Sequence, residues 1–232
     1  LGPPDLDRAF RQHDVYVKAL ESAGLVVEVL PAMDDFPDSC FVEDVAVCAR
    51  SFALIARPGA PSRQGEESAI REALSRHFRI TEGLSEPGTL EGGDVMAVGN
   101  AFHIGLSART NTEGARQLLA ALERHGQGGV IEPVPKDILH LKTGMSYLDD
   151  GIVVCLDAFK DRPSMAGLRR VPVPPDEARG ANCLRINDTV LVPSGCPKVA
   201  AGVKAAGLKV VELDIGEFHK IDGGLSCLSL RF

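Results

Sequence analysis

The feature that most constrains the fold is a pair of short apolar segments that recurs along the chain. In each copy a first apolar run, an Asn/Asp/Gly break and a second apolar run follow one another. Four copies begin at Asp44, Asp94, Gly144 and Asn182. Two apolar runs joined by such a turn are the sequence signal of a β-hairpin. A fifth start at Gly224 supplies a single run, over residues 225–232.

Helical patterns lie between the hairpins. Apolar residues at helical spacing predict helices over residues 5–23 and 65–78. Asn111 can cap a third helix, and Pro197 is suited to the first turn of a fourth. Single β-branched runs follow a helix at residues 26–30 and 209–213. The repeating unit is therefore hairpin, helix, strand.

These units predict an α/β fold of five hairpin–helix–strand units around a pseudo-fivefold axis. The first unit has a helix and a strand but no hairpin, and the last has half a hairpin. A closed ring would need a strand before Leu1 to pair with residues 225–232, so we expect this chain to lack a native N-terminal strand. Residues 1–232 are expected to form a single domain. The alternative, chance similarity among β-rich segments, does not explain why the turn residues recur in the same place.

Composition excludes several classes of protein. The 232 residues carry 25 Lys and Arg against 32 Asp and Glu, which gives a net charge of −7. This balance argues against a nucleic-acid surface, and no apolar run approaches the roughly 18 residues that a membrane span needs. The six cysteines form no C-x-x-C pair, so neither a disulfide framework nor a structural zinc site is expected. We therefore expect a reducing, cytoplasmic setting.

Residues able to carry chemistry cluster just before the first strand of each unit. Glu43, Asp44, Glu91 and His140 all occupy such positions, and Cys227 follows the fifth start. In a ring, equivalent strand ends point to a common axis, so these side chains are expected to meet in one central site. Taken singly, the cysteine also fits a buried strand position and the histidine a structural one.

Several segments with their spacing resemble the dimethylarginine dimethylaminohydrolase family of the amidinotransferase (pentein) superfamily. The segments are residues 36–44, 90–94, 107–111, 139–144 and 222–229. The resemblance implies a five-bladed α/β propeller that hydrolyses asymmetric dimethylarginine or monomethylarginine to citrulline and dimethylamine or methylamine. It also implies an N-terminal strand and a mobile lid loop, in keeping with the deficit inferred above.

The resemblance implies a catalytic set of Cys227, His140 and Glu91. A guanidinium carbon is a poor electrophile, and a thiolate is a strong nucleophile that can form a covalent S-alkylthiouronium intermediate at this carbon. His140 would protonate the departing amine and then deprotonate the attacking water. Glu91 would orient the imidazole and contact the guanidinium. We expect Cys227 to lose its proton only when the cationic substrate is bound.

The resemblance also implies a set of substrate-binding residues. They are Asp38, Phe41, Glu43, Asp44, Arg63, Arg109, Ile221 and Ser226. Glu43 and Asp44 would hold the guanidinium nitrogens, because carboxylates can pair with a planar cation in a bidentate way. Arg63 and Arg109 would bind the α-carboxylate. The α-amino group would be received by Asp38 and the backbone carbonyl of Ile221.

No cofactor and no required metal are expected, although a thiol and an imidazole in one pocket, Cys227 and His140, can capture an inhibitory zinc ion. The expected partner is a small methylated arginine, with no nucleic acid and no membrane, and the chain is expected to be a monomer or a homodimer. Two alternatives stay open. One is an arginine deiminase-like guanidine-modifying enzyme with the same thiol, imidazole and carboxylates. The other is a non-catalytic pentein binding module, which would need neither Cys227 nor His140.

Overall fold

The computed structural model describes residues 2–232, and their contacts group into two units. Unit 1 comprises Leu1–Pro31 and Thr143–Ser226, and unit 2 comprises Ala32–Lys142 and Cys227–Phe232. The expectation that residues 1–232 form one domain stays a prediction. Among the described residues, none of the helices combines the length and the apolar character needed to cross a membrane.

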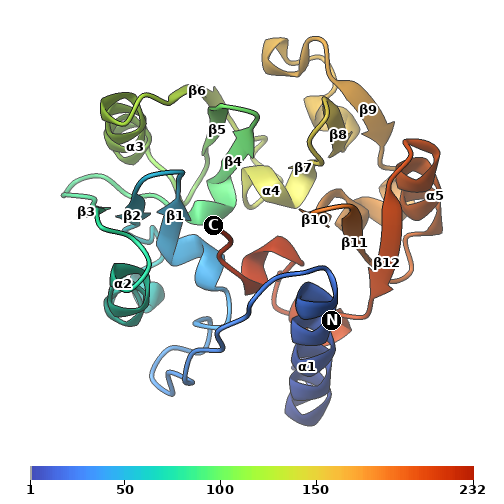
Figure 1. The fold of residues 1–232 in the computed structure, drawn as a ribbon, viewed down its shortest axis with the longest axis horizontal. Coiled ribbons are helices and arrows are strands. Elements are labelled where there is room, and N and C mark those ends of the chain that lie inside the picture. Colours follow the sequence, from blue (N-terminus) through green and yellow to red (C-terminus); the bar gives the residue numbers. More distant parts are fainter. Residues whose placement is uncertain (1) are drawn as a thin grey trace. The chain divides into compact units, whose positions relative to one another are not determined.

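All four predicted hairpins are present, and each has a third strand that runs parallel to the hairpin's second strand (Figure 1). The sheets of unit 2 are β1 (Ala46–Cys48), β2 (Ala53–Ile55) and β3 (Thr81–Gly83), and β4 (Val95–Val98), β5 (Ala101–Leu106) and β6 (Gly128–Pro133). Those of unit 1 are β7 (Met145–Tyr147), β8 (Ile152–Cys155) and β9 (Arg169–Pro172), and β10 (Leu184–Ile186), β11 (Thr189–Pro193) and β12 (Lys209–Leu213). The hairpin's second strand is therefore the central strand of every sheet.

The predicted helices form close to their expected positions. They are α1 (Leu6–Ser22), α2 (Glu67–Ser75), α3 (Thr112–Arg124) and α5 (Pro197–Ala205). Asn111 caps α3 by accepting a hydrogen bond from the Gly114 backbone N–H at 2.8 Å. Between β8 and β9 the helix is replaced by two 3₁₀ turns, Asp157–Phe159 and Pro163–Met165. Two further helices are short, α4 (Leu141–Gly144) and α6 (Gly216–His219).

Two predicted strands are wrong, those over residues 26–30 and 225–232. A strand is stabilised by a hydrogen-bonded neighbour, and the described residues supply no ladder partner to either run. Val26 accordingly stands fully exposed. In the second run Ser226–Leu228 forms a 3₁₀ turn, so Cys227 lies in a helical turn and not on a strand.

Similar turns explain where the polar residues of unit 2 lie. The 3₁₀ turns Val42–Val45 and Gly92–Asp94 immediately precede β1 and β4. A Cβ atom on Gly92 would overlap the backbone carbonyl of Glu43, so glycine is required for the two turns to approach each other this closely. The carboxylates expected at the strand starts therefore project from neighbouring helical turns.

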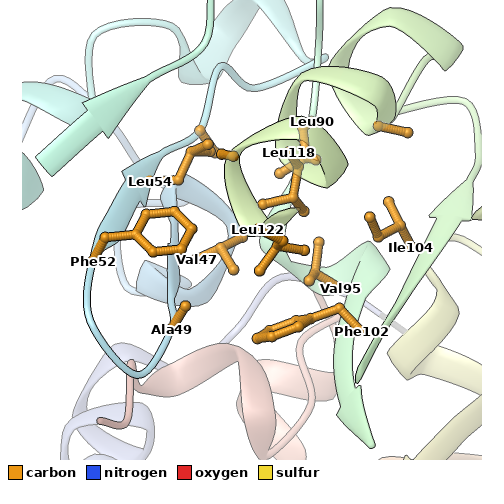
Figure 2. Packing of buried hydrophobic residues seen from close by; sticks show 13 residues of the cluster. Val47, Ala49, Phe52, Leu54, Leu90, Val95, Phe102, Ile104, Leu118 and Leu122 are labelled. Atoms are coloured by element: carbon orange, nitrogen blue, oxygen red, sulfur yellow. The ribbon is translucent and has the colours of Figure 1, made fainter. Parts of the chain in front are cut away.

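The core of unit 2 holds these turns in place. Figure 2 shows Leu54 of β2 and Phe52 just before it facing Leu118 and Leu122 of α3, with Ile104 of β5 in the same cluster. All five side chains are buried. Burial of a large apolar side chain contributes roughly 1.5 to 3 kcal/mol, so this cluster fixes the sheets β1–β3 and β4–β6 to each other.

Unit 1 has its own apolar core. Val199 and Val203 of α5 are buried together with Val190 of β11 and Val171 of β9. Both sheets of this unit thus share a cluster with α5, the helix between β11 and β12. Because the cores of the two units are separate clusters, each holds its own sheets together.

Candidate active site

Three buried polar side chains of unit 2 converge, namely Asp44, Glu91 and His140. One oxygen or nitrogen atom from each lies within 4.8 Å of the others. Asp44 belongs to the turn before β1, Glu91 directly precedes the turn before β4, and His140 directly precedes α4. The structure thus brings together three residues that lie at or just before the starts of successive repeats.

His140 and Glu91 form a hydrogen-bonded pair, with 2.8 Å between Nε2 of the imidazole and Oε2 of the carboxylate. Burial alone would lower the pKa of His140, but the bond to Glu91 and the charges of Asp44 and Asp94 outweigh it and raise the pKa. Burial likewise opposes ionisation of Glu91, yet its bond to His140 and the charge of Arg109 hold its pKa below the usual range. Both directions favour an imidazolium–carboxylate pair.

The second oxygen of Glu91 is also held by the protein. It accepts hydrogen bonds from the Ala60 backbone N–H at 3.2 Å and from Nη1 of Arg109 at 3.4 Å. The Arg109 side chain is about a third exposed, so it can reach both the carboxylate and solvent. Its position fits the sequence prediction of a ligand for an incoming anion, which stays a prediction.

Asp94 fastens the segment that carries His140. Its carboxylate accepts hydrogen bonds from Ser107 Oγ at 2.6 Å, from Thr110 Oγ1 at 2.7 Å and from the Leu141 backbone N–H at 2.9 Å. Burial raises the pKa of Asp94 in spite of these donors. Because Leu141 follows His140 directly, the carboxylate fixes the backbone at the imidazole.

Gly93 makes room for the imidazole. A Cβ atom at this position would lie 2.8 Å from the His140 ring and 2.9 Å from Oδ1 of Asp44. The Gly93 backbone N–H also donates to that same oxygen at 2.9 Å. Gly93 therefore allows the close approach of His140 and donates a hydrogen bond to Asp44. The sequence around it has no phosphate-loop pattern, in agreement with this structural role.

Arg63 lies deep in the protein and is surrounded by acceptors. Its Nη1 donates to Oδ2 of Asp44 at 2.6 Å, and its Nη2 donates to Glu66 at 2.7 Å. Nη2 also donates to the carbonyls of Phe41 at 3.0 Å and Asp38 at 3.2 Å. Burial alone would lower the pKa of Arg63, but these carboxylates raise it above its ordinary value.

These contacts show Arg63 bracing the segment from Asp38 to Asp44, with its guanidinium directed at protein groups. The role of α-carboxylate ligand stays a prediction for this residue. Sequence reasoning missed Glu66, whose signal is its position three residues after Arg63 at the start of α2. The side chains of Arg63, Asp44 and Glu66 are almost fully buried, so the guanidinium and the two carboxylates depend on one another for charge neutralisation.

Glu43 carries two ion pairs. Its Oε1 lies 2.6 Å from Nζ of Lys142 and 3.1 Å from Nη2 of Arg231. Arg231 is in the C-terminal segment that also contains Cys227, so Glu43 ties this segment to the turn before β1. The sequence held no signal for the Arg231 contact, because a pairing between residues at opposite ends of the chain has no local pattern.

Cys227 is a half-buried cysteine that forms no disulfide, and it belongs to unit 2, the unit that also contains His140. Burial raises the pKa of the Cys40 thiol to about 11 and that of Cys48 to about 12, and it also raises those of Cys155 and Cys183. These four thiols are therefore poor sources of thiolate near neutral pH. Two predicted binding residues, Ile221 and Ser226, belong to unit 1, the former partly exposed and the latter buried.

The cluster of one imidazole and two carboxylates has the donor types that a divalent cation uses. Its oxygens, however, already accept from Arg63, Arg109 and the backbone N–H groups of Ala60 and Gly93. A carboxylate offers about four lone-pair sites, so the sites that remain can accept N–H groups from a planar organic cation. The zinc site expected at Cys227 and His140 stays a prediction.

The known proteins that this chain resembles are enzymes named for reactions of arginine or its methylated forms. The family model of arginine deiminase matches residues 31–172. The N(G),N(G)-dimethylarginine dimethylaminohydrolase of Pseudomonas aeruginosa is 43% identical over 233 residues, covering 100% of this chain and 91% of the relative. The enzyme of the same name from Streptomyces coelicolor is 43% identical over 225 residues, covering 96% and 85%.

Solved structures agree with these relatives. A dimethylarginine dimethylaminohydrolase with a His-to-Gly substitution, as an adduct with S-methyl-L-thiocitrulline, matches with a TM-score of 0.97 and 42% identity, covering 100% of this chain and 91% of that one. A Cys-to-Ser mutant of the Pseudomonas aeruginosa enzyme, complexed with citrulline, gives the same TM-score and coverage. The α/β pentein fold class predicted from the sequence is thereby confirmed. With 43% identity over its full length, the chain belongs to the N(G),N(G)-dimethylarginine dimethylaminohydrolase family.

Proposed function

We propose that this chain hydrolyses N-omega-methylated arginines, asymmetric dimethylarginine and monomethylarginine, to citrulline and dimethylamine or methylamine. The observation that carries the proposal is the buried His140–Glu91 pair beside Asp44. It supplies a charged acid and two carboxylates in one place, in a member of a family named for this reaction.

The carboxylates suit a guanidinium. Asp44 and Glu91 are buried, and in a medium of low dielectric constant their attraction for a cation is much stronger than in water. Carboxylates also accept N–H groups in directions that fix the plane of a guanidinium. The substrate carbon would then be held in one orientation toward the attacking thiol.

The chemical step needs a nucleophile and a proton donor. Cys227, as a thiolate, would attack the guanidinium carbon, and the C–N bond to the methylated nitrogen would break as that nitrogen takes a proton from the His140 imidazolium. The raised pKa of His140 supports a protonated imidazole at neutral pH. The products of this half-reaction are a covalent thiouronium and a free methylamine or dimethylamine.

The second half-reaction returns the enzyme to its starting state. The neutral His140 would take one proton from water as the oxygen attacks the thiouronium carbon. As the C–S bond breaks, the second water proton leaves the new hydroxyl for solvent, and citrulline and the Cys227 thiolate are released. No redox agent and no cofactor enter this sequence. The proton given to the amine is replaced by the proton taken from water, so the imidazolium is regenerated.

The substrate's amino-acid end needs its own ligands. We infer that Arg109, which is partly exposed, contributes to binding the α-carboxylate, and that the acidic charge balance favours a small cationic substrate over nucleic acid. A cytoplasmic location and a monomeric or homodimeric state remain predictions from the sequence.

The test is citrulline release from dimethylarginine, monomethylarginine and arginine, with Cys227→Ser as the matched variant. We expect turnover of the two methylated substrates, little turnover of arginine, and none by the variant. Citrulline formed from arginine at a comparable rate would move the assignment to a deiminase. Binding of methylated arginine without any turnover would favour the non-catalytic alternative.

A further inference from the structure

Asn182 opens the fourth repeat, at the position where the repeats of unit 2 carry carboxylates. Its side chain is buried and makes two hydrogen bonds to one residue, Ser226. Nδ2 donates to Ser226 Oγ at 3.0 Å, and Oδ1 accepts from the Ser226 backbone N–H at 2.9 Å. Both residues belong to unit 1, and the next residue along the chain is Cys227.

Asn182 is itself held on both sides. Ser146 Oγ on β7 donates to the carbonyl of Ala181 at 2.7 Å and accepts from the backbone N–H of Cys183 at 3.0 Å. The backbone that carries Asn182 is thus fixed by a buried hydroxyl immediately before and after it. A side chain mounted in this way can hold its partner with little freedom of its own.

The residues before Ser226 are held as well. Tyr16, a buried residue of α1, donates from its hydroxyl to the carbonyl of Leu225 at 2.8 Å. A Cβ atom on Gly224 would lie 2.5 Å from Cγ of Asn182, so the amide packs directly on the backbone there. Side-chain contacts therefore reach three consecutive residues, Gly224, Leu225 and Ser226, just ahead of Cys227.

We propose that Asn182 is a positioning residue which, acting through Ser226, fixes the backbone from which the Cys227 thiol is presented to substrate. This inference rests on the proposed function. Attack on a guanidinium carbon depends on the approach of sulfur, and a misplacement of about 1 Å can cost roughly a hundredfold in rate. An amide suits this position because it can donate to a hydroxyl and accept from an N–H at once, which an ionised carboxylate cannot do.

The test compares Asn182→Ala with a control of similar structural cost. Glu177→Ala removes a buried carboxylate of the same unit that accepts from the Lys198 and Val199 backbone N–H groups at 3.0 and 2.9 Å and so caps α5. Both variants are assayed on dimethylarginine at a temperature where thermal melts show each to be folded. We expect kcat of Asn182→Ala to fall roughly 10- to 100-fold with KM nearly unchanged. The control should lose thermal stability and keep its kcat.

A second measurement reads the backbone without turnover. Hydrogen exchange of the peptide over residues 224–229 should become faster in Asn182→Ala and stay as in wild type in Glu177→Ala. Unchanged exchange in Asn182→Ala, or a loss of kcat equal to that of the control, overturns the positioning role. Absence of citrulline from the wild type would count against the proposed function, and the exchange measurement would still decide whether Asn182 holds the segment before Cys227.

Discussion

His140 in unit 2 and His219 in unit 1 are both largely buried, yet their pKa values move in opposite directions. The pKa of His140 is raised, whereas burial and the neighbouring Arg179 lower the pKa of His219 to about 4. Nε2 of His219 is buried and has no hydrogen-bond partner among residues 2–232, while Nε2 of His140 is bonded to Glu91.

The difference shows that neighbours, and not burial, decide which imidazole can serve as an acid at neutral pH. Burial favours the neutral form of both rings. Around His140 the added charges are carboxylates, which favour the imidazolium. Around His219 the largest added charge is a guanidinium, and the one acidic neighbour, Asp214, is too weak to compensate.

The largest expected effect is on turnover. His140→Asn should reduce citrulline formation by roughly 10²- to 10⁴-fold, because it removes the proposed proton donor and acceptor. His219→Asn should keep turnover close to that of wild type. Steady-state assays of both variants on dimethylarginine make the comparison. A large loss of turnover in His219→Asn, with none in His140→Asn, would mean that His219 of unit 1 transfers the proton and would contradict the role proposed for His140.

The sequence could predict the features that depend on neighbours along the chain. Hairpin turns, the Asn111 cap and the Pro197 helix start are local, so the four hairpins and four longer helices were accessible. The repeat also predicted that Glu91 and His140 would meet, because the strand starts of units arranged in a ring are expected to point to a common axis. None of these predictions needed knowledge of a distant partner.

Features that depend on a distant partner were not accessible. Residues 26–30 have strand-like composition but no ladder partner, so they stay irregular. Arg231 reaches the candidate site only through Glu43, and a pairing between residues so far apart in the chain leaves no trace in a single sequence.

A smaller effect is expected on stability in acid. The pKa of His219 is about 4 in the folded chain and about 6.5 when unfolded, so both states are neutral above pH 6.5. As the pH falls from 6.5 to 4, the unfolded state takes up a proton that the folded state refuses, and stability is lost. The loss reaches at most about 3 kcal/mol, because partial exposure of the ring screens it.

The measurement is urea unfolding of wild type and His219→Asn between pH 7.5 and 4. The variant should lose less stability over this range.

The effect of pH on the contribution of His140 has the opposite sign. Its raised pKa contributes stability that is complete below pH 6.5 and lost as the pH rises through the pKa of the folded state. In His140→Asn the free energy of unfolding should therefore depend less on pH above pH 6.5 than in wild type. If the free energy of unfolding changes with pH in the same way in wild type and His219→Asn, the surroundings of His219 do not keep its imidazole neutral.

The smallest effect is expected from Glu91→Gln, which moves the pKa of His140 toward that of His219. Glu91→Gln replaces the bonded carboxylate by a neutral amide, so burial counts for more and the pKa of His140 should fall. Since the imidazolium is the proposed acid, the alkaline limb of the kcat–pH profile should move to lower pH. Asp44 and Asp94 remain, so the pKa should stay well above that of His219.

Glu82→Gln is the matched control, because Glu82 also bonds a histidine Nε2, that of His125, at 2.8 Å, but outside the Asp44–Glu91–His140 cluster. Its profile should coincide with that of wild type. Glu91 is also a proposed guanidinium ligand, so the height of the profile will drop in Glu91→Gln whatever happens to the imidazole. The position of the alkaline limb separates the two roles: a lower profile with an unmoved limb would mean that Glu91 acts on the substrate alone, and that Asp44 and Asp94 suffice to keep His140 charged.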